Sequence, residues 1–320
     1  MTVALTGASG FVGQALTRLL LAEGYHVRAL VRQTQLSEHN NLEIVHGDIA
    51  SRQSVEELVS GADVVIHLAG LVKSLDKERM TKVNNYGSGH LVKASERQGV
   101  KRFLYISSLA ARHPDVSHYA KTKHDGEAYL YDLPADGMHW DILRPPAVYG
   151  PGDTQVFIFF KMLKSRLGVI PGRKEARLSL IHVQDLAEAI YAWIHSKTAT
   201  QSIYELSGAN DSGYSWDEIF ETASRHLDIK PVIFRLPSPI LHAAAWAGYG
   251  LGKVTGKMPM LLPDKIGELQ WEDWCVRDTN FETKFDWSPK IDMDNGFEQT
   301  ENWYYQHGWL YPVRITLSQL

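Results

Sequence analysis

A glycine-rich turn near the start of the chain most constrains its fold. Gly7, Gly10 and Gly13 are spaced G-x-x-G-x-x-G. The turn lies between a short apolar run at Val3 to Leu5 and a helical pattern at Phe11 to Ala22. In a strand, glycine turn and helix, backbone N–H groups approach an anion and the helix N-terminus adds partial positive charge. A plain tight turn would also use glycines. The expected phosphate-binding residues are Gly7, Ser9, Gly10, Phe11, Val12 and Gly13.

Short apolar runs alternate with helical patterns along the first half of the chain. The runs are Val3 to Leu5, His26 to Val31, Glu43 to His46, Val64 to His67, Phe103 to Ile106 and Trp140 to Leu143. The helical patterns between them are Phe11 to Ala22, Ser54 to Ser60 and Arg79 to Gln98. Brief apolar runs that alternate with helices are typical of parallel strands joined by right-handed crossovers. The sequence predicts an α/β fold with a doubly wound parallel sheet.

The residue composition and the length of the apolar segments change after Gly150. Proline and glycine then punctuate shorter segments, and tryptophan becomes frequent towards the end of the chain. We expect a dinucleotide-binding domain over 1–150 and a smaller substrate-binding lobe over 151–180 and 207–320. The segment 181–206 is expected to return to the first domain.

Two pairs of residues have capping-box spacing. They are Asp185 with Glu188, and Ser215 with Glu218, and each pair predicts a helix start. The longest apolar stretch, Pro239 to Leu251, is too short for a bilayer, which needs about 20 residues. We interpret it as a core helix or a helix of the substrate pocket.

The composition limits the classes of partner that this chain is expected to bind. It has 320 residues, 44% of them hydrophobic, and a formal net charge of −4. A nearly balanced charge gives no basic field for nucleic acid or an anionic membrane, so neither is expected as a partner. The single cysteine, Cys275, excludes an internal disulfide and fits a reducing compartment. The first strand begins at Thr2, so we expect no signal peptide and a cytoplasmic location.

Three side chains suit proton transfer to or from a substrate oxygen. Tyr119 and Lys123 are one helical turn apart, and Ser108 follows the apolar run that ends at Ile106. Tyrosine has a pKa near 10 in water, and a nearby ammonium group favours its phenolate. Tyr-x-x-x-Lys by itself is frequent by chance in exposed helices. Together with Ser108 and the glycine turn, it indicates a tyrosine acid or base that works beside a nicotinamide, with Lys123 also binding the cofactor ribose.

The residues after the second apolar run bear on the choice of cofactor. An acidic residue about 20 positions after the glycines binds the ribose of NAD, whereas arginine accepts the 2′-phosphate of NADP. Arg32 and Gln33 occupy that place, and the next acidic residue is Glu38. The sequence favours NADP over NAD, although a solvated arginine at a strand end is the plain alternative.

Further cofactor contacts are expected where later strands end. Asp48 follows the third run and could accept a hydrogen bond from adenine. Ala69 and Gly70 follow the fourth run and are small enough for the cofactor to lie close. His67 is interpreted as a buried structural histidine.

These motifs together resemble the extended short-chain dehydrogenase/reductase family, which has a Rossmann-type fold. The group contains nucleotide-sugar epimerases and dehydratases, dihydroflavonol reductases and 3β-hydroxysteroid dehydrogenases. The matching segments are Thr6 to Gly13, Gly47 to Ile49, His67 to Gly70, Val83-Asn84 with Gly87, Tyr105 to Ser108, Tyr119 to Lys123, Leu143 to Pro151, Ile181 to Leu186 and Phe285 to Pro289. The resemblance implies a triad of Ser108, Tyr119 and Lys123. It also implies cofactor contacts at Ile49, Leu68, Asn84, Pro145 and Val148, and a homodimer through the two long helices after the fourth and fifth strands.

Departures from the family pattern bear on the substrate. Nucleotide-sugar enzymes usually have asparagine where this chain has Ala147, and arginine where it has Leu178. Arg173, Lys174 and Arg177 could still meet a diphosphate, or form a solvated basic loop. The apolar segment up to Leu251 and the methionines after it resemble the reductase and hydroxysteroid branch, which implies an apolar pocket.

Three functions remain open at this stage. The first is an NADP-preferring oxidoreductase that interconverts a hydroxyl and a carbonyl on a small or moderately apolar substrate. The second is a nucleotide-sugar epimerase or dehydratase with tightly bound NAD, and the third is a non-catalytic cofactor-binding structural or sensor protein. We predict no metal site, because His113, His118 and His124 are interpreted as surface residues.

Overall fold

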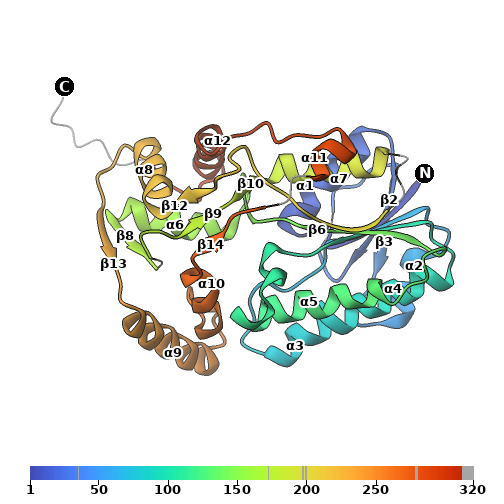
Figure 1. Ribbon diagram of the computed structural model, residues 1–320, viewed down its shortest axis with the longest axis horizontal. Helices are drawn as coiled ribbons and strands as arrows, with labels where there is room; N and C mark the ends of the chain where they lie inside the picture. The colour runs from blue at the N-terminus through green and yellow to red at the C-terminus, as the bar shows by residue number, and fades with distance from the viewer. Residues whose placement is uncertain (35, 172, 197, 199, 278–279, 312–320) are drawn as a thin grey trace.

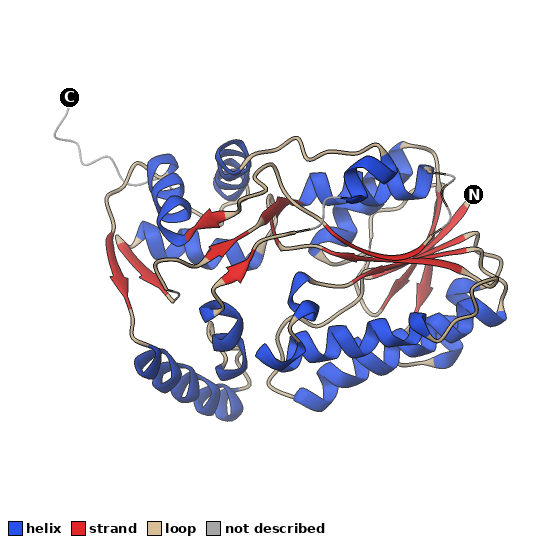
Figure 2. Ribbon diagram, in the orientation of Figure 1, coloured by secondary structure: helices blue, strands red, loops and turns tan. Residues whose placement is uncertain are grey.

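A parallel sheet of seven strands forms the centre of the molecule. The computed structural model describes residues 1–34, 36–171, 173–196, 198, 200–277 and 280–311. In this part of the chain the strand order is β11-β6-β5-β4-β1-β2-β3 (Figures 1 and 2). The strands are β1 (Thr2–Thr6), β2 (His26–Val31), β3 (Leu42–His46), β4 (Val64–His67), β5 (Arg102–Ile106), β6 (His139–Arg144) and β11 (Gln201–Glu205).

Helices cover both faces of this sheet because its side chains alternate between two apolar cores. On β1, Val3 and Leu5 join one core, and Ala4 joins the other. One face carries α1 (Phe11–Ala22), α7 (Val183–His195) and α11 (Asn280–Phe285), and the other carries α2 (Arg52–Val59), α4 (Ser88–Arg97) and α5 (His118–Tyr131). The predicted doubly wound α/β fold is confirmed.

The chain order of the sheet reverses between β1 and β4. These neighbours pair in parallel with Thr6 opposite His67, so the turns after both strands open at the same edge of the sheet. Ligands of open α/β sheets bind at such a reversal, outside the carboxyl ends of the strands. The topology therefore places the glycine turn at the expected binding edge.

The C-terminal lobe packs short strands and helices around an aromatic core. Its elements are β7 (Ala147–Tyr149), α6 (Thr154–Lys164), β8 (Leu167–Ile170), β9 (Arg177–Leu178), β10 (Leu180–His182), β12 (Tyr214–Ser215), α8 (Trp216–His226), β13 (Val232–Arg235), α9 (Ser238–Thr255), η4 (Pro263–Lys265), α10 (Ile266–Gln270), β14 (Asp273–Trp274) and α12 (Met293–Gln306). Phe160, Phe220 and Tyr304 are fully buried in this core. The lobe stands over the carboxyl edge of the sheet (Figure 1).

The chain returns from the lobe to the sheet twice. Strand β11 completes the sheet beside β6, and α7 packs on α1. Phe281, Phe285 and Trp287 also pack in the sheet core, although the sequence interpretation assigns them to the lobe.

One of the two capping boxes forms. Ser215 and Glu218 cap α8 reciprocally, as predicted. The Asp185 prediction is wrong, because α7 begins three residues earlier and His182 is its N-cap. The Asp185 carboxylate instead accepts backbone N–H groups of Lys290 and Ile291, both at 3.0 Å. It therefore ties the C-terminal segment to α7.

Helix α9 differs from its interpretation as a core or pocket helix. Leu241, Ala245 and Gly252 are buried, but Trp246 is 60% exposed and Val254 is 86% exposed. Most of its apolar surface therefore faces outward. Within the described residues, no helix combines the length and apolarity needed to cross a bilayer.

Candidate active site

A cleft of about 560 Å³ lies between the carboxyl edge of the sheet and the C-terminal lobe. It brings together twelve of the predicted site residues: Gly7, Gly10, Phe11, Val12, Gly13, Leu68, Gly70, Ser108, Tyr119, Lys123, Pro145 and Val148. The predicted residues outside its lining are Ser9, Arg32, Asp48, Ile49, Ala69 and Asn84. The cleft thus joins the glycine turn to the Ser, Tyr and Lys set.

The glycine turn is too tight for side chains. A Cβ on Gly7, which has φ +78°, would lie 2.7 Å from the backbone nitrogen of Ala69. A Cβ on Gly13 would lie 2.0 Å from the Gly7 carbonyl oxygen. No side chain of the described residues caps α1, and its first turn has no acidic residue. The exposed N–H groups of this helix start therefore suit the pyrophosphate of a dinucleotide.

Three predicted cofactor residues lie at the same sheet edge but beyond the cleft. Arg32 follows β2 and is exposed to solvent. Asp48 follows β3, and its carboxylate accepts the backbone N–H of Ala50 at 2.9 Å. Ile49 is 6% exposed and touches the turn at Gly87. Their contact with the adenosine end of a dinucleotide stays a prediction.

His67 connects the elements beneath the turn. Its Nδ1 is 2.7 Å from Thr6 Oγ1, and its Nε2 is 2.8 Å from Ser88 Oγ. Its ring stacks on Tyr105 with 5.0 Å between centroids. Burial, with the charge of Lys123 as a smaller cause, keeps the pKa of His67 well below its usual value. The ring is thus a neutral hydrogen-bonding group that joins β1, β4 and α4.

Tyr119 stands at the start of α5, which Ser117 caps through the backbone N–H of Ala120 at 2.9 Å. Burial, with the Glu268 carboxylate as a smaller cause, raises the pKa of Tyr119 to about 12, against the lowering effect of the Ser108 hydroxyl. Tyr119 is therefore a neutral phenol at pH 7. In this state it can donate a proton to a substrate oxygen.

Lys123 is buried behind Tyr119. Its Nζ donates to the Ile106 carbonyl at 2.8 Å and lies 4.2 Å from the centroid of the Tyr105 ring. Burial lowers the pKa of Lys123 to about 7, against the opposing effect of Glu127. Burial has the largest effect on the pKa of both groups, and it disfavours the phenolate of Tyr119 and the ammonium form of Lys123. That Lys123 favours the phenolate stays a prediction.

Asn84 lies in a π-helical turn, η1 (Lys82–Gly87), between α3 (Lys77–Thr81) and α4. These elements form the predicted helix of Arg79 to Gln98. The Asn84 side chain accepts from the backbone N–H of Leu71 at 2.7 Å and donates to the Leu71 carbonyl at 3.0 Å. It also donates to Thr122 Oγ1 at 3.0 Å. Asn84 therefore holds the loop after β4 against the helix that carries Tyr119.

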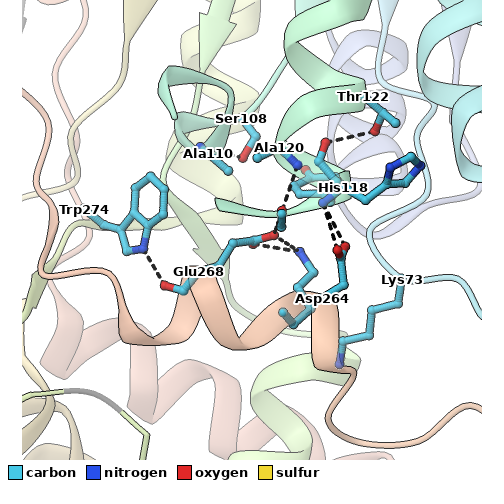
Figure 3. A network of polar contacts seen from close by, with 12 residues as sticks. Lys73, Ser108, Ala110, His118, Ala120, Thr122, Asp264, Glu268 and Trp274 are labelled. Atoms are coloured by element: carbon cyan, nitrogen blue, oxygen red, sulfur yellow. Dashed lines mark hydrogen bonds and ion pairs between the residues drawn. The ribbon is translucent and has the colours of Figure 1, made fainter. Parts of the chain in front are cut away.

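Residues of the C-terminal lobe reach α5, the helix that carries Tyr119, and none of them is among the predicted site residues. Lys265 Nζ lies 4.0 Å from the centroid of the Tyr119 ring and bonds both oxygens of Glu268 at 2.9 and 2.8 Å. Glu268 also accepts from the Ser117 hydroxyl. Figure 3 shows Glu268 below Ser108 and bonded to Trp274 through its carbonyl oxygen. A lysine and a glutamate three residues apart were the only sequence signal for this pair.

Asp264 strengthens the same contact between lobe and helix. Its carboxylate accepts the backbone N–H of His118 at 3.1 and 2.9 Å (Figure 3). It also pairs with Lys77 at 3.4 Å. The segment of η4 and α10 therefore closes one wall of the cleft.

The cleft as a whole has more apolar than polar lining. Its lobe side mixes the apolar Ala147, Val156, Leu178 and Trp274 with the polar Gln155, Ser179, Lys265 and Glu268. Asp153 also faces it, and burial raises the pKa of this carboxyl to about 6. The candidate diphosphate ligands are engaged elsewhere.

Arg177 donates to the carbonyls of Ser212 and Gly213 at 2.8 and 2.7 Å. Arg173 pairs with Glu272, and Lys174 is exposed to solvent. Among the described residues, neither arginine lines the cleft.

Comparisons with known proteins agree with this geometry. The fold and the cleft define a Rossmann-type NAD-binding protein. The model of the NAD dependent epimerase/dehydratase family matches residues 3–206. A ceramide reductase from Caulobacter vibrioides is 34% identical over 312 residues, which are 96% of either chain. The chain belongs to the NAD-dependent epimerase/dehydratase family, and the resemblance to the extended short-chain dehydrogenases/reductases is confirmed.

Two further comparisons show the range of this family. A 3β-hydroxysteroid dehydrogenase/Δ5→4-isomerase from Mycobacterium tuberculosis is 32% identical over 58% of this chain and 57% of that protein. The crystal structure of UDP-glucose 4-epimerase with UDP-glucose from Thermotoga maritima has a TM-score of 0.75 at 20% identity and covers 96% of this chain and 99% of its own. The relatives include oxidoreductases and epimerases, and this supports an enzyme.

Proposed function

We propose that this protein is an NAD(P)-dependent oxidoreductase that interconverts a carbonyl and a hydroxyl group on an apolar, lipid-like substrate. The observation that carries the proposal is that Tyr119, a phenol whose pKa burial raises, lines one largely apolar cleft together with Ser108 and Lys123. Nicotinamide would supply or take the hydride when it is bound. The chain's own residues supply the proton and the orientation.

Each member of the triad has a separate role in carbonyl reduction. Ser108 donates a hydrogen bond to the carbonyl oxygen and orients it. Tyr119 gives its proton to that oxygen as the carbonyl carbon gains the hydride, so the product is an alcohol and the phenolate is left to be reprotonated from solvent. Lys123 stands behind Tyr119, and its ammonium form would stabilise the phenolate during this step.

The substrate class follows from the lining of the cleft. Ala147, Leu178 and Trp274 offer apolar contacts, while the guanidinium groups of Arg173 and Arg177 are engaged outside it. The two arginines that were candidate partners of a sugar diphosphate are therefore outside the cleft, and Lys265 in its wall is already paired with Glu268. The ceramide reductase and steroid dehydrogenase similarities support a lipid carbonyl or hydroxyl instead.

NADP is the proposed cofactor over NAD. Arg32 is exposed at the end of β2, one strand away from the glycine turn, and could pair with a 2′-phosphate. Replacement Arg32→Asp should reverse the preference between NADPH and NADH. The measurement is dissociation constants for both nucleotides by fluorescence, with Arg18→Asp, an exposed arginine on α1, as the matched control.

The test is hydride transfer from deuterated NADPH and NADH to a panel of ketoceramides, ketosteroids and UDP-glucose. We expect deuterium in the alcohol from an apolar ketone, and a loss of about 10²–10⁴-fold in rate for Tyr119→Phe. Tyr204→Phe removes the hydroxyl of a buried tyrosine outside the cleft lining and should retain activity. Epimerisation of UDP-glucose without net nucleotide turnover would replace the proposal with the epimerase. Tight nucleotide binding with no turnover on the whole panel would replace it with a binding protein.

A further inference from the structure

The exposed apolar surface of α9 has the character of an interfacial helix. Its buried side runs through Leu241, Ala245 and Gly252. At 100° per residue the opposite side carries Ile240, Ala243, Ala247, Leu251 and Val254, and none of these is charged. Leu251 is 65% exposed and Ile240 is 52% exposed. An isolated exposed leucine needs no explanation, but a continuous apolar helix face of this kind marks an interaction site.

The charged residues of the segment that carries this face are all basic. Between Asp228 and Asp264 the chain has four basic residues, Lys230, Arg235, Lys253 and Lys257, and no Asp or Glu, although the whole chain has a net charge of −4. Arg235 pairs with Asp217. No ion pair of Lys253 or Lys257 occurs among the described residues. Lys253 follows Trp246 by seven residues and therefore lies on the same flank of the helix.

The apolar surface continues from α9 to the mouth of the cleft. Met258 and Met260, which follow the helix, are 49% and 61% exposed. The Met260 carbonyl accepts from Lys73 Nζ at 3.3 Å, next to Val72, which is 48% exposed and lines the cleft. Figure 1 shows α9 at the edge of the molecule below α10, whose segment closes the cleft wall.

We propose that this surface, defined by Ile240, Trp246, Leu251, Val254, Met258 and Met260, docks on a lipid bilayer that contains anionic lipid. An apolar helix face with a flanking aromatic and lysines inserts between headgroups without spanning the membrane. A substrate that stays in the bilayer would then meet the cleft at Val72. The uptake of a lipid substrate from the bilayer rests on the proposed function, whereas the docking itself does not. The proposal takes the place of the expectation that no membrane is a partner.

A second copy of the chain is the competing occupant of this surface. Charge decides between them, because a symmetric pair would bring together two copies of a segment that has basic residues and no Asp or Glu, and the like charges would repel. Anionic headgroups instead attract them.

The test is flotation of the full chain with vesicles of phosphatidylcholine, with and without phosphatidylglycerol. We expect binding to the anionic vesicles that weakens as salt rises, since the Debye length falls to about 8 Å at physiological ionic strength. Leu251→Glu with Val254→Glu should abolish flotation. Lys253→Glu with Lys257→Glu should weaken it by roughly fivefold or more per lysine.

Matched variants separate docking from misfolding and from catalysis. Tyr311→Glu places a charge on another exposed apolar side chain, and Lys101→Glu with Lys284→Glu repeats the charge change on exposed lysines elsewhere; all should float like the wild type. Tyr119→Phe should also float, so a failure of the proposed reaction leaves the docking result readable. Circular dichroism checks the fold of each variant.

Two results would overturn the docking proposal. One is a wild-type chain that stays with the soluble fraction on anionic vesicles at low salt. The other is a dimer in solution that Leu251→Glu with Val254→Glu converts to a monomer without any vesicle binding by the wild type, because a second copy would then cover the surface. Quenching of Trp246 by brominated lipid, absent in Trp246→Phe, supports insertion of the α9 face.

Discussion

The two walls of the cleft are built in different ways. On the sheet wall, each functional group comes from a strand end or the first two turns of a helix, and buried contacts such as those of His67 and Asn84 fix its place. On the lobe wall, Lys265, Glu268 and Asp264 reach the catalytic helix through a few side-chain pairs from a segment about 150 residues away in sequence. The buried contacts of the sheet wall hold the proposed hydride- and proton-transfer groups in fixed positions. The lobe wall is held by a few side-chain pairs, so substitutions there can change the substrate or the pH dependence without disturbing those groups.

The largest effect on stability is expected at Glu127, one turn after Lys123 on the sheet wall. Its fully buried carboxylate accepts from Ser107, Tyr131 and Arg144, with Arg144 Nε at 2.9 Å. Glu127→Leu would leave the Arg144 charge buried without its partner and should cost about 3–5 kcal/mol of unfolding free energy. Urea denaturation measures it.

The matched control is Glu56→Leu, which breaks the exposed pair with Arg97 and should cost at most about 1 kcal/mol. Equal losses for the two variants would contradict the view that the sheet wall is held by its buried contacts.

A smaller loss is expected at Gly13 in the glycine turn. A Cβ there would lie 2.0 Å from the Gly7 carbonyl oxygen, so Gly13→Ala must move the turn. Overpacking of this kind costs about 1–3 kcal/mol, and a displaced turn should also weaken nucleotide binding. Thermal unfolding with and without NADPH reports both effects, and an unchanged nucleotide-induced rise in Tm would argue against the turn as the phosphate site.

On the lobe wall, Glu268→Gln should shift the pH dependence of kcat/KM and have only a small effect on the free energy of unfolding. Its carboxylate raises the pKa of Tyr119, so its removal lowers that pKa. Reduction needs the protonated phenol, and the basic limb of kcat/KM should therefore begin at a lower pH. Glu272→Gln, at the exposed pair with Arg173, should leave the profile in place. A shift in the opposite direction would show that Lys265 and Glu268 act on Tyr119 in some other way.

The smallest expected effect is at Gly250, on the exposed side of α9. An added Cβ would meet no atom within 4 Å, and its φ lies outside the left-handed region. Gly250→Ala should stabilise the protein by about 0.5–1 kcal/mol, because alanine loses less backbone entropy in a helix. Differential scanning calorimetry of Gly250→Ala and Gly13→Ala compares the two changes in stability. A loss of stability in Gly250→Ala would mean that another part of the protein packs on this side of α9.

Local patterns predicted the sheet wall well. The strand runs, the glycine turn and the Tyr119 to Lys123 spacing each lie within one short segment, so period and residue type were enough to place them. The Asp185 capping box was wrong because a tertiary contact with the backbone of Lys290 and Ile291 uses that carboxylate. Whether an Asp side chain caps a helix depends on which backbone N–H groups lie next to it in the folded chain, and its sequence spacing alone does not show that.

The sequence by itself determined the parallel sheet, the glycine turn and the spacing of Ser108, Tyr119 and Lys123, the proposed proton-transfer groups, because these depend on neighbours along the chain. Only the tertiary structure decided that burial keeps Tyr119 protonated, that Lys265 and Glu268 stand beside it, and that the apolar face of α9 points outward. Burial and long-range pairing are set by how distant segments pack. The residue pattern of one segment does not show which other segment will pack against it.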